Sequence, residues 1–158
     1  SPPAGSVAAM PVDPSATGRV FPTQAYEVSR ERIREFADAI GERNPIHRDT
    51  EVAKALGHGE VIAPPTFAMI PVLRGFDVLM DDLGIVYARV IHANQRFVHV
   101  RPIRAGDQLR TTTTLDTVRS VGGNDLLGIR CEVESSTGER ICTATATLLI
   151  REVGGDGA

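Results

Sequence analysis

The chain has 158 residues, of which 42% are hydrophobic and 23% are charged, a composition typical of a globular domain with a core of its own. The formal net charge of −3 argues against a broad electrostatic surface for nucleic acid. The two cysteines, Cys131 and Cys142, have neither metal-type spacing nor a disulfide framework. They flank a predicted turn and are possible neighbours across a hairpin. We expect two reduced thiols in a cytoplasmic protein.

The two ends of the chain differ in composition from the rest. Residues 1–18 are rich in Pro, Ala, Ser and Gly, and they lack the positive charge and the long apolar stretch of a signal peptide. We expect them to form a flexible tail, residues 19–152 to form a single domain, and residues 153–158 to fray. The longest uncharged run, residues 61–73, contains three prolines and is too short for a membrane span, so no membrane partner is expected.

The first predicted helix covers residues 30–40. Ser29 is its expected N-cap, and Gly41 is the expected left-handed residue beyond its end. Apolar residues recur along it at helical spacing and predict a buried stripe: Ile33, Phe36, Ala37 and Ile40. A polar loop follows, in which Asn44 and Pro45 favour a turn. A second, shorter helix is predicted over residues 50–56.

A third helix is predicted from Thr66 to about Met80. Its residues are mostly apolar on every side, which is typical of a helix buried all round. Pro71 must kink this helix or lie within its first turn.

The second half of the chain has the alternating pattern of strands. Strands are predicted over residues 95–100, 109–118, 126–135 and 141–151, and Gly138 lies in a hairpin turn between the last two. Additional strands near residues 25–28 and 85–92 would complete a sheet. Helices followed by an antiparallel meander predict an α+β fold, in which a curved antiparallel sheet wraps around one central buried helix.

The polar loop after the first helix carries the clearest candidate chemistry. Glu42 and His47 are five residues apart with an Asn-Pro turn between them, so the two side chains can approach a common point. An acid and an imidazole within about 3 Å of one water molecule can orient and deprotonate it. A solvated polar loop is the alternative. His58, His92 and His99 are expected to be structural or exposed.

Two further groups of residues are candidates for binding. Because Pro64 and Pro65 have no N–H, Thr66 and Phe67 offer the first amide donors of the central helix, which could stabilise an oxyanion. The alternative is an ordinary helix start. Three arginines near a predicted turn could bind the phosphates of an anionic cofactor tail, although surface solvation is an equal alternative: Arg96, Arg101 and Arg104.

Several enzyme classes lack their motifs. The chain contains no Gly-x-Gly-x-x-Gly and no P-loop lysine, which argues against nucleotide-dependent hydride or phosphoryl transfer. It has no Gly-x-Ser-x-Gly elbow and no His/Cys cluster with zinc spacing, so no metal ligand is predicted.

Three segments resemble one family in the right order. Residues 41–47, Gly-Glu-Arg-Asn-Pro-Ile-His, resemble the motif Gly-Asp-x-Asn-Pro-(Leu/Ile/Val)-His of the MaoC-like (R)-specific enoyl-CoA hydratases and dehydratases. Residues 61–67 are similar to the Ala-Pro-Pro-Thr-Phe segment that opens the central helix in the FAS1-like dehydratase branch. Residues 95–97 and 101–107 resemble the strand and turn of that branch. The resemblance covers residues 19–151 and implies a hot-dog fold.

The resemblance also implies a reaction. Glu42 and His47 would hold the water that adds to a trans-2-enoyl thioester of CoA or acyl carrier protein, and the reverse reaction would dehydrate an (R)-3-hydroxyacyl thioester. Thr66 and Phe67 would bind the thioester oxygen, and Asn44, grouped with them as a substrate-binding candidate, would mainly shape the loop. No cofactor is implied, and the fold implies a homodimer or a heterodimer with a related hot-dog subunit.

One residue departs from the family motif. Glu42 stands where the family has Asp, and its extra methylene can move the carboxylate by about 1 Å, a displacement that is costly in catalysis. Two alternatives to an active hydratase therefore remain: a non-catalytic, acyl-binding subunit of a heterodimeric dehydratase, and a hot-dog thioesterase. The thioesterase ranks last, because residues 66–75 contain no acid and Asp77 comes late in the helix.

Overall fold

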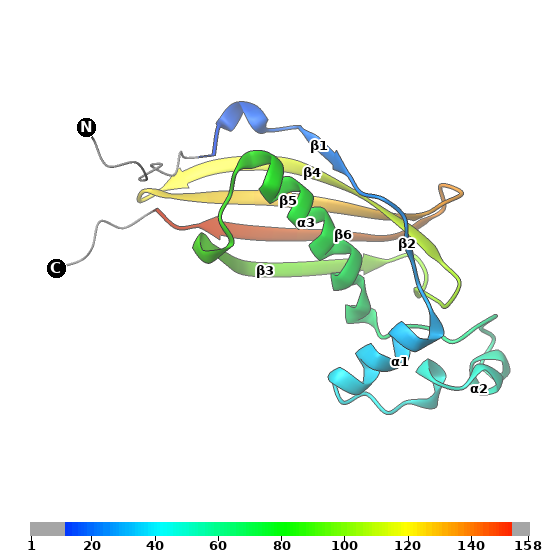
Figure 1. The fold of residues 1–158 in the computed structure, drawn as a ribbon. Helices are drawn as coiled ribbons and strands as arrows, with labels where there is room; N and C mark the ends of the chain where they lie inside the picture. Colours follow the sequence, from blue (N-terminus) through cyan, green and yellow to red (C-terminus); the bar gives the residue numbers. More distant parts are fainter. Residues whose placement is uncertain (1–11, 153–158) are drawn as a thin grey trace, which may run out of the picture.

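A computed structural model describes residues 12–152 (Figure 1). Within these residues the chain forms three α-helices and one antiparallel sheet of six strands in the order β1-β4-β5-β6-β3, with β2 also paired to β4. The helices are α1 (Arg30–Ala39), α2 (Thr50–Ala55) and α3 (Met69–Leu83). The strands are β1 (Val20–Pro22), β2 (Tyr26–Glu27), β3 (Val90–His99), β4 (Gln108–Val121), β5 (Asn124–Ser135) and β6 (Arg140–Ile150).

The long strands β4, β5 and β6 form the predicted meander, and α3 lies across one face of the curved sheet (Figure 1). Alternate residues of each strand point toward α3, so that the inward side chains of β5 and the inner face of the helix share one core. Its largest fully buried members include Phe67, Val72, Leu79, Leu115, Leu127 and Ile129. The predicted α+β class and the hot-dog arrangement are confirmed.

The helix α1 follows from local signals in the sequence. The Ser29 hydroxyl caps it by accepting a hydrogen bond from the Arg32 amide at 3.1 Å, and Gly41 has a positive φ of 73° just beyond its end. Ile33 and Ala37 of the predicted stripe are fully buried, and Phe36 is partly buried. Ile40 is 50% exposed, because α1 ends at Ala39 and Ile40 is its C-cap, where the backbone leaves the helical conformation.

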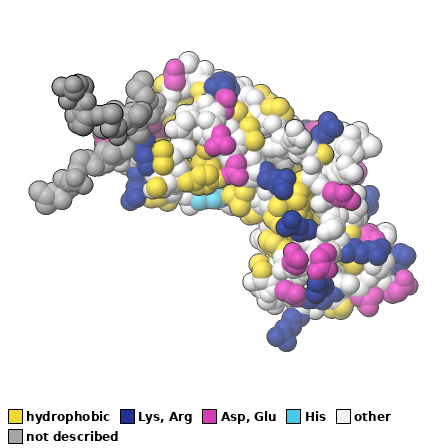
Figure 2. All heavy atoms as spheres, viewed as in Figure 1, with side chains coloured by type: hydrophobic (Ala, Val, Ile, Leu, Met, Phe, Trp, Pro, Cys, Tyr) yellow, Lys and Arg dark blue, Asp and Glu magenta, His cyan; other side chains and the backbone are white. Residues whose placement is uncertain are grey.

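The central helix is less buried than predicted. Pro71 lies within the first turn of the helix, which is the predicted alternative to a kink. Leu73 and Val78, however, are 44% and 37% exposed. These residues lie on the solvent-facing side of α3, with Leu73 at the edge of the helix next to β3. Figure 2 shows hydrophobic side chains on this face of the molecule. A helix apolar on all sides therefore has only one side covered within the described part of this single chain.

The edge strands also differ from prediction. Residues 85–89 are not a strand, because they include a 3-10 turn, η4 (Tyr87–Arg89). The two strands predicted near residues 85–92 and over residues 95–100 are instead one strand, β3 (Val90–His99). The strand β1 was not predicted, and β2 has only two residues. Both short strands lie on the outer side of β4, where pairing partners rather than sequence alternation decide their extent.

The predicted flexible tail is too long. Residues 12–18 pack on the sheet through a 3-10 turn, η1 (Pro14–Ala16), and Val12 and Ala16 are buried. The Val12 amide donates a hydrogen bond to Asp125 at 2.9 Å, and the Gly18 amide donates to the Leu115 carbonyl at 2.7 Å. The predictions for residues 1–11 and 153–158 lie outside the described residues. Within residues 12–152, each helix is too short or too polar to cross a membrane.

Candidate functional site

The loop between α1 and α2 has a defined conformation that its sequence explains. The Asn44 side chain accepts a hydrogen bond from the Ile46 amide at 3.0 Å and so caps a 3-10 turn, η2 (Pro45–His47). Pro45 occupies the first position of this turn, where its missing N–H costs nothing. Asn44 therefore shapes the loop, as expected, and the turn ends with His47 facing the next segment of chain.

The imidazole of His47 is held in one tautomer. The residue is only 7% exposed, and its Nδ1 lies 2.7 Å from the main-chain oxygen of Ile62. A carbonyl oxygen can only accept a hydrogen bond, so Nδ1 must carry the proton and donate it. In the neutral ring Nε2 then keeps its lone pair. His47 is thus oriented as a proton acceptor, the state that a general base needs.

Glu42 is half-buried at the start of the same loop. One of its carboxylate oxygens, Oε1, accepts a hydrogen bond from the Asn44 amide at 3.0 Å. Its main chain is fixed on both sides, because its amide donates to Ala37 at 2.8 Å and its carbonyl oxygen accepts from Arg48 at 2.6 Å. The carboxylate is therefore folded over the loop that carries His47, with Oε2 free of hydrogen bonds to the described residues.

The start of the central helix lies next to this loop. The segment Ile62–Ala63 that receives the His47 hydrogen bond leads directly into a 3-10 turn, η3 (Pro65–Ala68), and then into α3. The ring of Phe67 packs edge-on against Phe36 of α1 at a centroid distance of 5.4 Å. In Figure 1, α1, α2 and the beginning of α3 gather at the same end of the molecule.

Only one of the two predicted amide donors is available. The Phe67 amide donates to the Pro64 carbonyl at 2.9 Å within η3, so its prediction as an oxyanion donor is wrong. The Thr66 amide has no hydrogen-bond acceptor among residues 12–152, and Thr66 is exposed. The 3-10 geometry explains the difference, because its i to i+3 bonds engage the third residue of the turn and leave the second free.

The three predicted arginines do not form one phosphate site. Arg101, whose side chain is 16% exposed, makes two hydrogen bonds to Asp107 at 2.9 and 3.0 Å and also binds Glu139 at 2.8 Å. Its guanidinium is therefore committed to structural ion pairs, and its prediction as a phosphate contact is wrong. Arg104 is 47% exposed and 3.8 Å from Asp107, and it remains a candidate.

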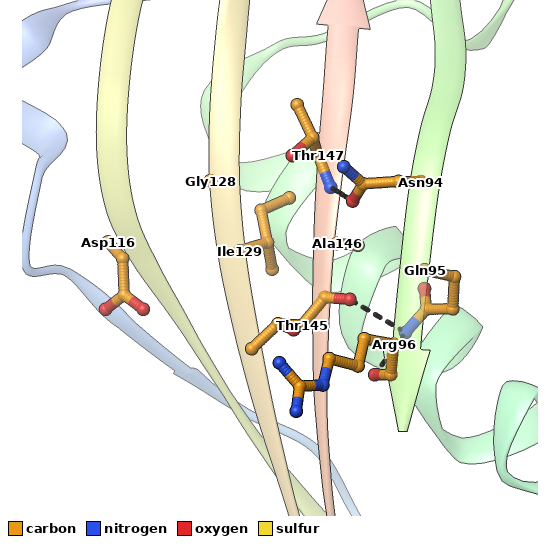
Figure 3. Close-up of a pocket in the computed structure, with 9 residues that line it drawn as sticks. All are labelled: Asn94, Gln95, Arg96, Asp116, Gly128, Ile129, Thr145, Ala146 and Thr147. Atoms are coloured by element: carbon orange, nitrogen blue, oxygen red, sulfur yellow. Dashed lines mark hydrogen bonds between the residues drawn. The ribbon is translucent and has the colours of Figure 1, made fainter. Parts of the chain in front are cut away.

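Arg96 lies on the outer face of the sheet, away from the helix. There it lines a surface pocket of about 420 Å³ together with residues from four strands (Figure 3). Asp116 lies on the far side of this pocket, on β4, where it pairs with Arg130 at 3.1 Å. Successive side chains of a strand point to opposite faces, so Arg96 and the inward-facing Phe97 are on different sides of the sheet.

A second cavity, of about 180 Å³, lies between α3 and β3. It is lined by His92 and by six mainly apolar residues: Leu73, Phe76, Met80, Tyr87, Val90 and Leu148. His92 also packs against Phe76 at a ring distance of 5.7 Å, and His99 lies 6.0 Å from Phe97. These contacts agree with the expectation that both histidines are structural or exposed, His92 being exposed and His99 partly buried. Within residues 12–152, no group of three or more His, Cys, Asp or Glu is placed to hold a metal ion.

Two elements of the site were not singled out from the sequence. The first is the Ile62 carbonyl that receives the His47 proton, which no side-chain pattern can reveal. The second is Glu60, whose carboxylate binds Arg30 of α1 and Thr50 of α2 and also accepts from the Val61 amide. A Glu directly before an apolar extended segment was the only available signal for this residue.

Comparisons with known proteins agree with the fold. Residues 15–144 match the family model described as FAS1-like, dehydratase domain region. The chain is 51% identical over 145 residues to a UPF0336 protein of Saccharopolyspora erythraea, covering 90% of this chain and 93% of that protein. A UPF0336 protein of Streptomyces coelicolor is 48% identical over 145 residues, with 90% and 97% covered.

Two solved structures are also similar. A chain of the C-terminally truncated HadBC (3R-hydroxyacyl-ACP dehydratase) complex from Mycobacterium tuberculosis aligns with a TM-score of 0.75 and 30% identity, covering 85% of this chain and 96% of that one. A MaoC-like dehydratase aligns with a TM-score of 0.80 and 29% identity, covering 88% of this chain and 43% of that longer chain.

Proposed function

The chain belongs to the family of FAS1-like dehydratase domains, and from this premise we propose that it is a hydro-lyase that interconverts trans-2-enoyl and (R)-3-hydroxyacyl thioesters. The hydrogen bond from His47 Nδ1 to the Ile62 carbonyl carries the proposal. It leaves Nε2 unprotonated in the neutral ring, so that His47 can take a proton from water. Residues 41–47 supply this base and a carboxylate in the spacing of the family motif.

The proposed hydration uses three groups of the chain. Glu42 and His47 bind one water molecule, and His47 Nε2 removes a proton as the water oxygen bonds to the β-carbon of the enoyl thioester. The electron pair of the double bond moves toward the thioester carbonyl and forms an enolate. The Thr66 amide hydrogen-bonds the enolate oxygen. The α-carbon then takes back the proton from the Glu42–His47 pair, and the double bond is consumed.

The carboxylate at position 42 is compatible with this role. Its Oε1 accepts from the Asn44 amide, which holds the longer Glu side chain against the loop and leaves Oε2 for water. A carboxylate that is already oriented loses less conformational entropy when it binds the water. Dehydration is the same path reversed. The substrate carrier is CoA or acyl carrier protein, and no metal or redox group takes part in the proposed steps.

A second candidate is a partner subunit of a heterodimeric dehydratase. It is favoured by exposed apolar residues on α3, in η4 and on β3: Leu73, Val78, Tyr87 and Ile91. Within residues 12–152, β3 pairs only with β6, so its other edge is free to pair with a second chain. The similarity to a chain of the HadBC complex supports assembly with a related hot-dog subunit. A thioesterase is less well supported, because Asp77 is exposed two turns into α3.

The test is the loss of enoyl absorbance when the purified chain is mixed with crotonyl-CoA and then with longer trans-2-enoyl-CoA substrates. We expect turnover by the wild type and none by His47→Ala. Equal rates for the two proteins would exclude His47 as the base. Absence of turnover at every chain length, followed by turnover when a co-purifying hot-dog subunit is added, would favour the partner-subunit function.

A further inference from the structure

The Glu60 carboxylate joins the helices on both sides of the His47 loop to the segment that orients His47. We propose that Glu60 is a positioning residue: it holds the segment Val61–Ala63 in place and thereby fixes the Ile62 carbonyl that receives the His47 Nδ1 proton. The catalytic consequence of this role rests on the function proposed above. The geometric part, the tautomer of His47, can be measured independently of any activity.

Four hydrogen bonds converge on this one carboxylate. Oε1 accepts from Arg30 Nε at 3.0 Å, from Thr50 Oγ1 at 3.2 Å and from the Val61 amide at 2.9 Å, and Oε2 accepts from Arg30 Nη2 at 2.5 Å. Arg30 is the first residue of α1 and Thr50 is the first residue of α2. Glu60 therefore fastens the helix before the catalytic loop and the helix after it to the same point of the chain.

Ile62, whose carbonyl receives the His47 proton, lies two residues beyond Glu60. The Ile62 amide donates to the Ile46 carbonyl at 3.3 Å, and the Ile62 carbonyl accepts from His47 Nδ1 at 2.7 Å. On the other edge of the segment, the Ala63 amide donates to Ile103 at 2.7 Å. Residues 61–63 are thus a short extended strip between η2 and residues 103–105, and Glu60 is the side chain that fixes its beginning.

The charge of Glu60 suits a permanent structural role. The Arg30 guanidinium lowers the pKa of the Glu60 carboxyl to about 2, and the side chain is 20% exposed. The carboxylate consequently stays ionised throughout the neutral range, and its hydrogen bonds persist there. Without it, the Val61 amide would lose its acceptor, and the strip would be fastened only by its main-chain hydrogen bonds, such as the one from the Ala105 amide to the Val61 carbonyl at 3.0 Å. The Ile62 carbonyl could then move away from Nδ1, and the imidazole would be free to adopt the other tautomer.

The experiment compares Glu60→Ala and Glu60→Gln with the wild type. The ¹⁵N shifts of the His47 ring, assigned by comparison with His47→Ala, report which nitrogen carries the proton. We expect the Nδ1-protonated form in the wild type, a mixture of tautomers in Glu60→Ala, and a smaller change in Glu60→Gln, whose amide oxygen can still accept from Val61. In the hydration assay, Glu60→Ala should lower kcat by about 100-fold, as expected for displacement of a catalytic group by about 1 Å, with little change in KM.

Glu51→Gln is the matched control. Glu51 lies in the first turn of α2, is exposed, and its carboxylate makes no hydrogen bond to the described residues. It should leave both the tautomer and kcat unchanged. If folded Glu60→Ala keeps the wild-type tautomer, the proposal is overturned, whatever happens to stability. If Glu60→Ala does not fold, the result for Glu60→Gln decides: the proposal predicts a partial loss of the Nδ1-protonated form in this variant, and no loss at all overturns it.

The two proposals can fail separately. If the wild type hydrates no enoyl thioester, the proposed function is overturned. If the Nδ1-protonated form of His47 is nevertheless present in the wild type and lost in Glu60→Ala, the positioning role is supported. If the wild type is active, and both Glu60 variants keep its His47 tautomer and its kcat, the proposed function is supported and the positioning role is overturned.

Discussion

Gly75 of α3 lies directly against Thr113 of β4, with no room for a Cβ between the helix and the strand. A Cβ built on Gly75 would also lie 3.2 Å from the methyl group of Thr111. Both threonines are buried, so neither can swing its side chain into solvent. This contact sets how closely the middle of α3 approaches the sheet, and with it the direction of the helix whose beginning forms the candidate site.

We therefore predict that Gly75→Ala destabilises the fold. Overpacking a buried contact typically costs about 1–3 kcal/mol, which exceeds the gain of about 1 kcal/mol from replacing Gly by Ala in a helix. Urea unfolding of the variant measures the loss. Gly59→Ala is the control, because a Cβ at Gly59 meets nothing within 4 Å. Equal stabilities for the two variants would show that the helix and strand can move apart at little cost.

The parts of the fold that the sequence predicted correctly depend on local signals. The Ser29 cap and Gly41 bound α1 because both act through the backbone within one turn. The meander of β4, β5 and β6 follows from alternation along each strand, which needs no knowledge of the neighbours. The position of His47 at the end of a capped turn likewise follows from Asn44 and Pro45 alone.

What could not be predicted depends on contacts between distant segments. The apolar pattern of α3 does not say which side meets the sheet, so the exposure of Leu73 and Val78 was missed. Arg101 was grouped with its sequence neighbours, but its ion pair with Glu139 connects two different turns. Glu60 makes its bonds across 30 residues to Arg30, and no periodicity marks such a pair.

The ion pair of Arg101 gives a second prediction. Its side chain and that of Asp107 are 16% and 7% exposed, so Arg101→Ala leaves a buried carboxylate without its main partner. Breaking a buried pair from one side costs about 3–5 kcal/mol, and we expect a loss of about 3 kcal/mol, because the Arg104 amide still donates to Asp107. Urea unfolding should show this loss. Arg104→Ala, which removes a more exposed partner, should cost less than about 1 kcal/mol, and the reverse order would contradict the assignment.

The buried thiols predict the behaviour of the fold in alkali. Burial raises the pKa of both Cys131 and Cys142 to about 11, whereas an unfolded cysteine titrates at about 8.5. Between these values the folded chain keeps two protons that the unfolded chain has lost, so stability falls as pH rises through this range.

The measurement for this third prediction is the free energy of unfolding at pH 8 and at pH 10. The wild type should lose more stability between these values than the double variant Cys131→Ala, Cys142→Ala, although the variant starts lower because it has lost buried volume. Only the slopes are compared. The same pH dependence in both proteins would mean that the thiols titrate normally in the folded chain.

The last prediction distinguishes two residues that act through their side chains in the proposed chemistry, Glu42 and His47, from Thr66, which acts through its main-chain amide. Glu42→Gln and His47→Ala should each lower enoyl hydration by orders of magnitude, because the first removes the charge that orients the water and the second removes the base. Neither side chain belongs to the apolar core, so both variants should keep the fold. Thr66→Ala should be mild, because it keeps the amide that has no acceptor among residues 12–152. Initial rates with crotonyl-CoA, together with circular dichroism spectra, distinguish loss of chemistry from loss of fold. Unchanged rates in the first two variants would remove both residues from the site, and a large loss in Thr66→Ala would assign the oxyanion contact to the hydroxyl instead of the amide.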